Sequence, residues 1–191
     1  MSGIEAVFCR SYPWRIFAER AVLPWSVAGT EPAGRVLEVG TGSGATATAL
    51  LRRYPDITLV AGDYDPAMVA AAADRLASAG DRASAVRVDA TAIDFPDGAF
   101  DTVLSFLMLH HVLDWERALG EMVRVLKPGG RLIGYDLLST RTTRLIHDVD
   151  RSPYRLIAPG EFERELARLP VRPDILDEGR LLVRFALTKS S

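Results

Sequence analysis

The sequence predicts an α/β protein with a doubly wound, mainly parallel sheet of seven strands and a C-terminal antiparallel hairpin. Three observations favour this fold class. Short apolar segments alternate with helical segments from residue 35 to residue 169. The first apolar segment runs directly into a glycine-rich turn and then a helix, the connection that such sheets use beside a bound nucleotide. Two extended segments flank the turn Asp177-Glu178-Gly179 near the end of the chain, which is typical of a hairpin.

The composition is that of an ordinary globular protein. The chain has 191 residues, of which 48% are hydrophobic and 25% charged, so it is long enough to bury a substantial core. A formal net charge of −2 gives no basic field and does not favour a nucleic-acid partner. The single cysteine, Cys9, excludes an intramolecular disulfide and a cysteine-cluster metal site. Neither a signal peptide nor a membrane span is evident, so we expect a cytoplasmic protein.

The N-terminal residues predict an amphipathic helix ahead of the sheet. Large and small apolar residues recur there at helical spacing, at Trp14, Phe17, Ala18, Ala21, Val22 and Trp25. Pro13 suits the first turn of this helix, and Pro24 is expected to limit its end. Residues 29–34 are then expected to form a linker into the sheet.

We expect one domain over residues 1–191, with 1–34 as a helical extension and 35–191 as the sheet core. The extension has two possible roles. It is either a lid, in which Tyr12 and Trp14 cover the ligand cleft, or an element that packs against a helix of the core.

The remaining apolar segments predict the strands, which span Arg35–Val39, Thr58–Asp63, Ala85–Asp89, Phe100–Phe106, Arg131–Asp136, Val171–Leu176 and Arg180–Lys189. Helices are expected between them, at residues 45–51, 66–76 and 115–126 and in two stretches after the fifth strand, the second at about 159–169. Asp65 and Pro66 are a good N-cap and first-turn pair for one of these helices.

Gly40, Gly42 and Gly44 lie between the first strand and the first helix of the core. Their missing Cβ atoms permit a tight turn and let a ligand approach bare backbone. The free N–H groups of the following helix then face that ligand. A glycine turn that merely joins a strand to a helix is the alternative, so the run alone does not identify a site.

Three acidic residues lie on or at the ends of the strands that follow one another in this sheet. Asp63 and Asp89 are predicted at the carboxyl ends of their strands, where ligands of such sheets bind. A carboxylate there can accept hydrogen bonds from ribose hydroxyls or an adenine amino group, although a loop cap is the alternative. Glu38 lies inside the first strand, where burial requires a partner. That partner is either an arginine nearby or a ligand.

With these residues in order, the sequence resembles the class I S-adenosylmethionine-dependent methyltransferases, particularly the compact group related to quinone-biosynthesis methyltransferases. The resemblance runs from Val36 to about Asp136. It is carried by ordered motifs at compatible spacing, namely Val36-Leu37-Glu38-Val39-Gly40-Thr41-Gly42-Ser43-Gly44, Gly62-Asp63-Tyr64-Asp65-Pro66, Asp89-Ala90, Phe95-Pro96-Asp97-Gly98-Ala99-Phe100-Asp101, Leu109-His110-His111-Val112 and Leu126-Lys127-Pro128-Gly129-Gly130.

The resemblance implies a set of cofactor-binding residues at the strand ends. The methionine part of S-adenosylmethionine would be bordered by Glu38, Gly40, Thr41, Gly42 and Gly44, with the backbone at Phe106 meeting its amino group. Asp63 would hold the ribose. The adenine would be flanked by Tyr64 and Met68, with Asp89 on its amino group and the Ala90 backbone beside it. Met68 is equally consistent with a core position.

The implied chemistry needs few protein groups. The sulfonium activates its own methyl group, so transfer is governed by proximity and orientation, and we expect no metal. A general base is needed only when the acceptor arrives protonated. His110 and His111, just after the fourth strand, are the candidates, and at most one is expected to serve because adjacent side chains point in different directions. Packing or capping is their alternative role.

The residues just after the fourth strand favour a small-molecule acceptor. Ser105-Phe106-Leu107-Met108 replaces the Asn/Asp-Pro-Pro-aromatic run of amino-directed nucleic-acid methyltransferases, and the sequence has no Pro-Cys nucleophile for cytosine methylation. Two other functions stay open. A nicotinamide-dependent oxidoreductase also uses a glycine loop, although here the third glycine falls one position early for its fingerprint. A non-catalytic S-adenosylmethionine-binding protein would carry the same cofactor motifs.

Overall fold

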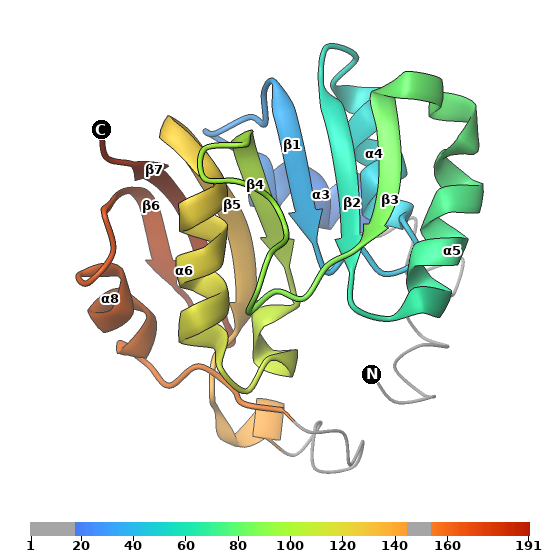
Figure 1. The fold of residues 1–191 in the computed structure, drawn as a ribbon. Coiled ribbons are helices and arrows are strands. Elements are labelled where there is room, and N and C mark those ends of the chain that lie inside the picture. The colour runs from blue at the N-terminus through green and yellow to red at the C-terminus, as the bar shows by residue number, and fades with distance from the viewer. Residues whose placement is uncertain (1–17, 145–153) are drawn as a thin grey trace.

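The structure, a computed structural model, describes residues 18–144 and 154–191, and the strands of these residues form one sheet (Figure 1). The seven strands have the order β3-β2-β1-β4-β5-β7-β6. Their bounds are β1 Arg35–Val39, β2 Thr58–Asp63, β3 Ala83–Arg87, β4 Phe100–Phe106, β5 Leu126–Leu137, β6 Val171–Glu178 and β7 Leu182–Lys189. Strands β1 to β5 pair in parallel, whereas β7 is antiparallel to both β5 and β6. The predicted fold class, including the C-terminal hairpin, is confirmed.

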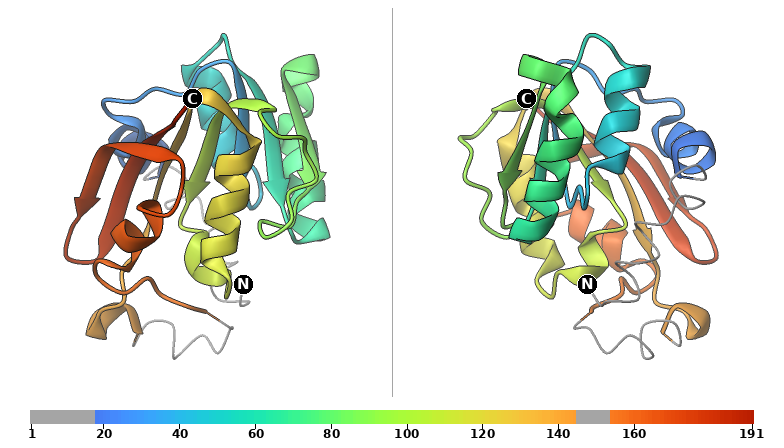
Figure 2. Two further views of the ribbon diagram at one scale, coloured as in Figure 1. Left: turned by 60° about the vertical axis from the view of Figure 1, so that its left-hand side comes forward. Right: turned by 90° about the vertical axis from the view of Figure 1, so that its right-hand side faces the viewer.

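Helices cover both faces of the sheet (Figure 2). One face carries α3 Leu23–Val27, α4 Ala45–Arg53 and α5 Pro66–Leu76, and the other carries α6 Trp115–Val125 and α8 Glu161–Leu166. Shorter helical turns are η1 Ala18–Val22, η2 Ala77–Arg82 and η3 Leu109–His111. Strand β1 contributes Val36 to the core with α4 and Leu37 to the core with α6. It is apolar on both faces because both are covered.

The predicted end of the N-terminal helix at Pro24 is wrong. Residues Ala18–Val22 form a π-helical turn, and an α-helical segment starts at Leu23 and continues to Val27. Pro24 therefore falls in the first turn of a new segment, where its missing N–H needs no acceptor. Trp25 packs edge-to-face on Tyr135 of β5, with ring centroids 5.3 Å apart. At this end of the extension, the Trp25 side chain thus packs on a strand of the sheet.

The lid hypothesis rests on Tyr12 and Trp14, which lie outside the described residues together with Pro13 and Phe17. It stays a prediction. The linker at residues 29–34 is confirmed as irregular chain between α3 and β1. Arg184 of β7 holds the end of α3, since its guanidinium donates to the Ala28 carbonyl and lies over the Trp25 ring.

Other boundaries differ by a few residues. Strand β3 ends at Arg87, so Asp89 lies in the loop beyond it and not on its last position. Helix α6 ends just before Lys127-Pro128-Gly129-Gly130, as predicted, but these residues already belong to β5. The pairing of β5 with β4 has an irregular register there. The late helix α8 is shorter than expected. Of the other stretch after β5, residues 141–144 are helical and 145–153 lie outside the described residues.

The carboxyl ends of the parallel strands meet at one edge of the sheet, toward which the arrowheads of β1 and β4 point in Figure 1. At this edge lie the glycine turn after β1, Asp63 at the end of β2 and η3 shortly after β4. The fold therefore gathers the strand-end motifs where such sheets bind ligands.

Close packing of the sheet centre gives a testable prediction at Gly134 of β5. A Cβ at this position would overlap the Ser105 carbonyl oxygen and lie 2.6 Å from Cζ of Phe185. We expect Gly134→Ala to lower the free energy of unfolding by about 1–3 kcal/mol, because neither neighbour has room to move. Gly120 in α6 is the matched control, since an added Cβ there meets nothing within 4 Å. Gly120→Ala should be neutral or stabilise by about 0.5–1 kcal/mol. Urea unfolding of both variants tests this, and equal effects would contradict it.

Candidate functional site

The glycine turn between β1 and α4 is anchored to the end of β2. The backbone N–H groups of Gly40 and Thr41 both donate to the Gly62 carbonyl, at 2.8 and 3.0 Å. Gly42 N–H donates to Oδ2 of Asp63 at 2.8 Å. These hydrogen bonds fold the turn back over the neighbouring strand, so its position is set by β2 as well as by β1.

The glycines of this turn have different surroundings. All three have positive φ, +79° at Gly40, +55° at Gly42 and +77° at Gly44. A Cβ at Gly40 would overlap Met108, whereas a Cβ at Gly42 would meet nothing within 4 Å. The space beside Gly42 is therefore open and bounded by bare backbone, as a nucleotide-binding turn requires.

Asp63 combines a structural contact with room for a ligand. Its Oδ2 accepts from Gly42 N–H, and its Oδ1 accepts from Asp65 N–H at 3.0 Å. Because a carboxylate has about four acceptor positions, two backbone donors leave capacity for a pair of hydroxyls. The loop-cap role and the ribose-binding role are thus compatible at this residue.

Glu38 is buried on β1, with 2% of its surface exposed. Its hydrogen-bond partner is the Thr41 hydroxyl, which donates to Oε2 at 2.6 Å, and within residues 18–144 and 154–191 it has no arginine partner. Burial raises the pKa of Glu38 from 4.5 to about 7, with Asp63 adding to the rise and the Thr41 hydrogen bond opposing it. Glu38 therefore changes its charge near neutral pH at the base of the glycine turn.

The residues assigned to the adenine lie beyond β2 and β3. Tyr64 is exposed, and the Arg87 guanidinium lies 4.9 Å from its ring centroid. Met68 is buried on α5, which agrees with a core position. The Ala90 side chain is also buried, and Val88 N–H donates to the Asp63 carbonyl at 2.9 Å, which ties this loop to the end of β2.

Asp89 caps its own loop, which is the alternative role that its position allows. Its Oδ1 accepts from the hydroxyl and the N–H of Thr91, at 2.7 and 2.8 Å. These hydrogen bonds, that of the hydroxyl first, hold the pKa of Asp89 below its usual value. The side chain is exposed and ionised, and its second oxygen is available to a donor such as an exocyclic amino group.

The two histidines after β4 have separate environments. His110 is buried, and its Nδ1 lies 2.6 Å from Oδ1 of Asp136. His111 is half-buried, and its ring lies 4.0 Å from that of His110. The Phe106 ring, which precedes them, stacks on Tyr135 at 5.5 Å, so its side chain packs while its backbone ends β4.

Asp136 is a residue of this edge that the sequence pattern does not single out. The pattern marks it only as the last position of the fifth strand, yet it is fully buried and accepts hydrogen bonds from Met108, Leu109, Leu137 and His110. An aspartate at the end of a predicted strand is the same kind of signal that points to Asp63 and Asp89. Its partners Met108, Leu109 and His110 lie in the segment that follows β4, far from Asp136 in the sequence. The sequence pattern therefore does not reveal these contacts.

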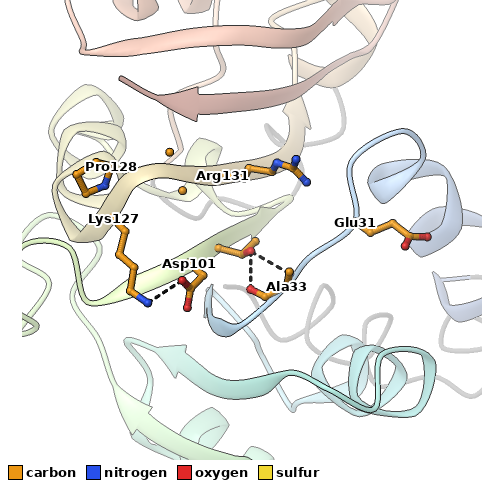
Figure 3. Close-up of a pocket in the computed structure, with 9 residues that line it drawn as sticks. Glu31, Ala33, Asp101, Lys127, Pro128 and Arg131 are labelled. Carbon is orange, nitrogen blue, oxygen red and sulfur yellow. Dashed lines mark hydrogen bonds and ion pairs between the residues drawn. The ribbon is translucent and has the colours of Figure 1, made fainter. Parts of the chain in front are cut away.

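A separate hollow of about 300 Å³ lies at the opposite edge of the sheet, near the start of β4 and β5 (Figure 3). Its lining includes Glu31, Asp101, Lys127 and Arg131, and Lys127 points to Asp101 with Nζ 2.6 Å from Oδ1. None of the sequence-predicted site residues lines it. Its lining belongs to the edge where the strands begin, so it is not the predicted cleft.

The described ranges, 18–144 and 154–191, contain neither a metal-binding cluster nor a membrane-spanning helix. No group of three or more His, Cys, Asp or Glu side chains in these ranges is arranged to hold a metal ion. None of the helices in the same ranges is both long and apolar enough to cross a bilayer.

The strand order, the antiparallel β7 and the glycine turn with its strand-end carboxylates define a class I methyltransferase fold. Residues 37–134, just over half of the chain, match the methyltransferase domain family of type 11. The chain belongs to this family.

Individual relatives match over part of their length. The demethylmenaquinone methyltransferase of Thermus thermophilus is 41% identical over 99 residues, which cover 52% of this chain and 45% of the relative. The malonyl-[acyl-carrier protein] O-methyltransferase of Herminiimonas arsenicoxydans is 36% identical over 142 residues, covering 73% of this chain and 47% of the relative. The chain thus spans about half the length of these relatives.

A solved structure shares the fold over nearly the whole chain. The geranyl diphosphate C-methyltransferase of Streptomyces coelicolor, in complex with Mg²⁺, geranyl diphosphate and S-adenosylhomocysteine, superposes with a TM-score of 0.79. The comparison covers 94% of this chain and 83% of the other at 13% identity. At this identity the likeness shows the fold alone.

The buried Glu38 gives stability a pH dependence with a definite sign. Because its folded pKa of about 7 exceeds the ordinary 4.5, the folded protein binds the proton more tightly. This contribution to stability is fully present below pH 4.5 and is lost as the pH rises to about 7. The loss is roughly 3 kcal/mol at most. Glu38→Gln keeps an oxygen that can accept from the Thr41 hydroxyl but does not titrate. It should therefore remove this part of the pH dependence of the free energy of unfolding.

Urea unfolding of the wild-type protein and Glu38→Gln at pH values from about 5 to 8 measures the difference, and other titrating groups cancel in the comparison. Parallel stability curves for the two proteins would show that Glu38 ionises at its ordinary pKa.

Proposed function

We propose that this protein binds S-adenosylmethionine at the carboxyl edge of the sheet and transfers its methyl group to a small molecule. The observation that carries the proposal is the glycine turn tied to Asp63, with open space beside Gly42. That arrangement offers bare backbone to one part of a nucleoside and a carboxylate to another. The match to the methyltransferase domain family supports the same assignment.

The cofactor-binding roles follow the geometry of the turn. We assign the methionine part to Glu38 and to the turn formed by Gly40, Thr41, Gly42 and Gly44, with the Phe106 backbone at its amino group. Asp63 would take the ribose hydroxyls with the acceptor capacity that Gly42 and Asp65 leave. Tyr64, Met68, Asp89 and Ala90 would border the adenine. A cationic amino group near Glu38 would favour ionised Glu38, because an opposite charge offsets the effect of burial.

S-adenosylmethionine, when bound, supplies a methyl group already activated by the sulfonium. The chain has to hold the donor, align the acceptor with it and exclude water. The segment that precedes α8 lies against this edge of the sheet, because the Arg155 N–H donates to the His110 carbonyl at 2.9 Å. Arg155 is itself fixed by Glu116 and Glu161, which its guanidinium contacts.

His110 is the better placed of the two candidate bases. Its Nδ1 faces a carboxylate that orients the ring, as in other carboxylate–imidazole pairs, so proton transfer to His110 has to use Nε2. This role applies to acceptors that arrive protonated, such as phenols or alcohols. His111, whose ring is tilted by 41° against that of His110, is proposed to pack.

The names of similar proteins support a small-molecule acceptor without selecting one. They include a demethylmenaquinone methyltransferase, an O-methyltransferase of a malonyl group on its carrier protein and a C-methyltransferase of geranyl diphosphate. Both carbon and oxygen acceptors thus occur among them. The nicotinamide-dependent oxidoreductase that the glycine run left open receives no support from the family match.

The proposal predicts that the purified protein binds S-adenosylmethionine and S-adenosylhomocysteine in calorimetry. Asp63→Asn should weaken S-adenosylhomocysteine binding by about 1.5–3 kcal/mol, the scale of a charge-assisted hydrogen bond. Asp101→Asn, which changes a carboxylate at the opposite edge, is the control and should bind as the wild type does. Binding of a nicotinamide dinucleotide in place of both adenosyl compounds would overturn the proposal. If Asp63→Asn folds and binds S-adenosylhomocysteine with unchanged affinity, a group other than Asp63 holds the ribose.

A further inference from the structure

The turn that leaves β4 is strained. Leu107 has φ of +51°, in the left-handed region that favours glycine. Its N–H donates to the Tyr135 carbonyl at 2.9 Å. A residue other than glycine persists in this conformation only where neighbouring contacts hold the backbone in place, and such strain is often found at functional sites.

Asp136 at the end of β5 supplies those contacts. Its Oδ2 accepts from the N–H groups of Met108 and Leu109, at 2.9 and 2.7 Å. Its Oδ1 accepts from Leu137 N–H at 2.7 Å and faces Nδ1 of His110 at 2.6 Å. The three backbone donors leave one of the roughly four acceptor positions of a carboxylate, and that position faces Nδ1 of His110. The side chain is fully buried, which removes competition from water.

The turn held in this way presses Met108 against the glycine turn after β1. A Cβ at Gly40 would lie 2.8 Å from Cβ of Met108 and would overlap its Cγ. Met108 therefore occupies the space that a side chain at Gly40 would need. Gly40 N–H in turn donates to the Gly62 carbonyl, beside Asp63. A continuous set of contacts connects Asp136, Met108 and the glycine turn.

We propose that Met108 braces the glycine turn in the conformation that binds the adenosyl cofactor, and that Asp136 is the positioning residue that holds Met108 there. The inference rests on the proposed function, because the ligand of the turn is S-adenosylmethionine or its product. A long, unbranched thioether suits this place, since it fills a narrow gap between two backbone segments without a branch at Cβ. The end of β5 thereby influences a cofactor site built mainly by β1 and β2.

The test is calorimetry with S-adenosylhomocysteine on Met108→Ala, Asp136→Asn and the double variant. In Asp136→Asn an amide NH₂ replaces one carboxylate oxygen, so in either orientation of the amide at least one of the backbone N–H groups of Met108, Leu109 and Leu137 loses its acceptor. Each single variant should weaken binding about tenfold. The double variant should bind S-adenosylhomocysteine with about the affinity of the single variant that binds less tightly, because both changes act through one contact. Met108→Leu keeps the volume and should bind within about twofold of the wild type.

Leu113→Ala is the control, since Leu113 follows the same turn but is 59% exposed. It should leave affinity unchanged. Wild-type affinity in a folded Met108→Ala, or fold-changes that multiply in the double variant, would overturn the inference while the cofactor assignment stands. Failure of the wild-type protein to bind S-adenosylhomocysteine would instead overturn the proposed function. If Asp136→Asn does not fold, the contrast between Met108→Ala and Met108→Leu decides.

Discussion

The hydrogen bonds that fasten the glycine turn to the end of β2 are the constraint on which the site depends. Gly40 and Thr41 donate to the Gly62 carbonyl, and Gly42 donates to Asp63. The parallel pairing of β1 with β2 places these groups side by side, with Val39 opposite Gly62. Donor and acceptor are both backbone groups at Gly40, Thr41 and Gly62, so these two hydrogen bonds follow from the strand pairing, whereas the third depends on the Asp63 carboxylate. The strand pairing thus determines where a nucleoside can lie.

Buried carboxylates at this edge have distinct tasks that their partners determine. Glu38 has one described hydrogen-bond donor, the Thr41 hydroxyl, and burial raises its pKa to about 7. Asp136 is as deeply buried but accepts from three backbone N–H groups and faces His110. The first is suited to respond to a cationic ligand, and the second is suited to hold a strained turn. Burial alone would not separate these roles.

The sequence predicts the sheet and the edge at which the strand-end motifs meet, because strand periodicity, glycine spacing and strand-end aspartates are local patterns. It fails where a contact joins distant segments. A π-helical turn at Ala18–Val22 precedes the α-helical segment that contains Pro24, and no local propensity indicates such a turn. Asp136 and Met108 gain their importance only when β5 and the turn after β4 meet. The Thr41 partner of Glu38 is only three residues away, so a local pattern contains it, although burial of a carboxylate first suggests an arginine or a ligand.

A cofactor site does not by itself establish that a methyl group is transferred, since a protein that only binds S-adenosylmethionine would show the same turn and the same carboxylates. The most direct measurement uses S-adenosylmethionine labelled on its methyl carbon, incubated with the protein and the small-molecule fraction of a cell extract. We predict label in a small molecule together with an equal amount of S-adenosylhomocysteine, and loss of both with Asp63→Asn at a limiting cofactor concentration. Bound cofactor that stays intact with every fraction tested, and no labelled product, would contradict it.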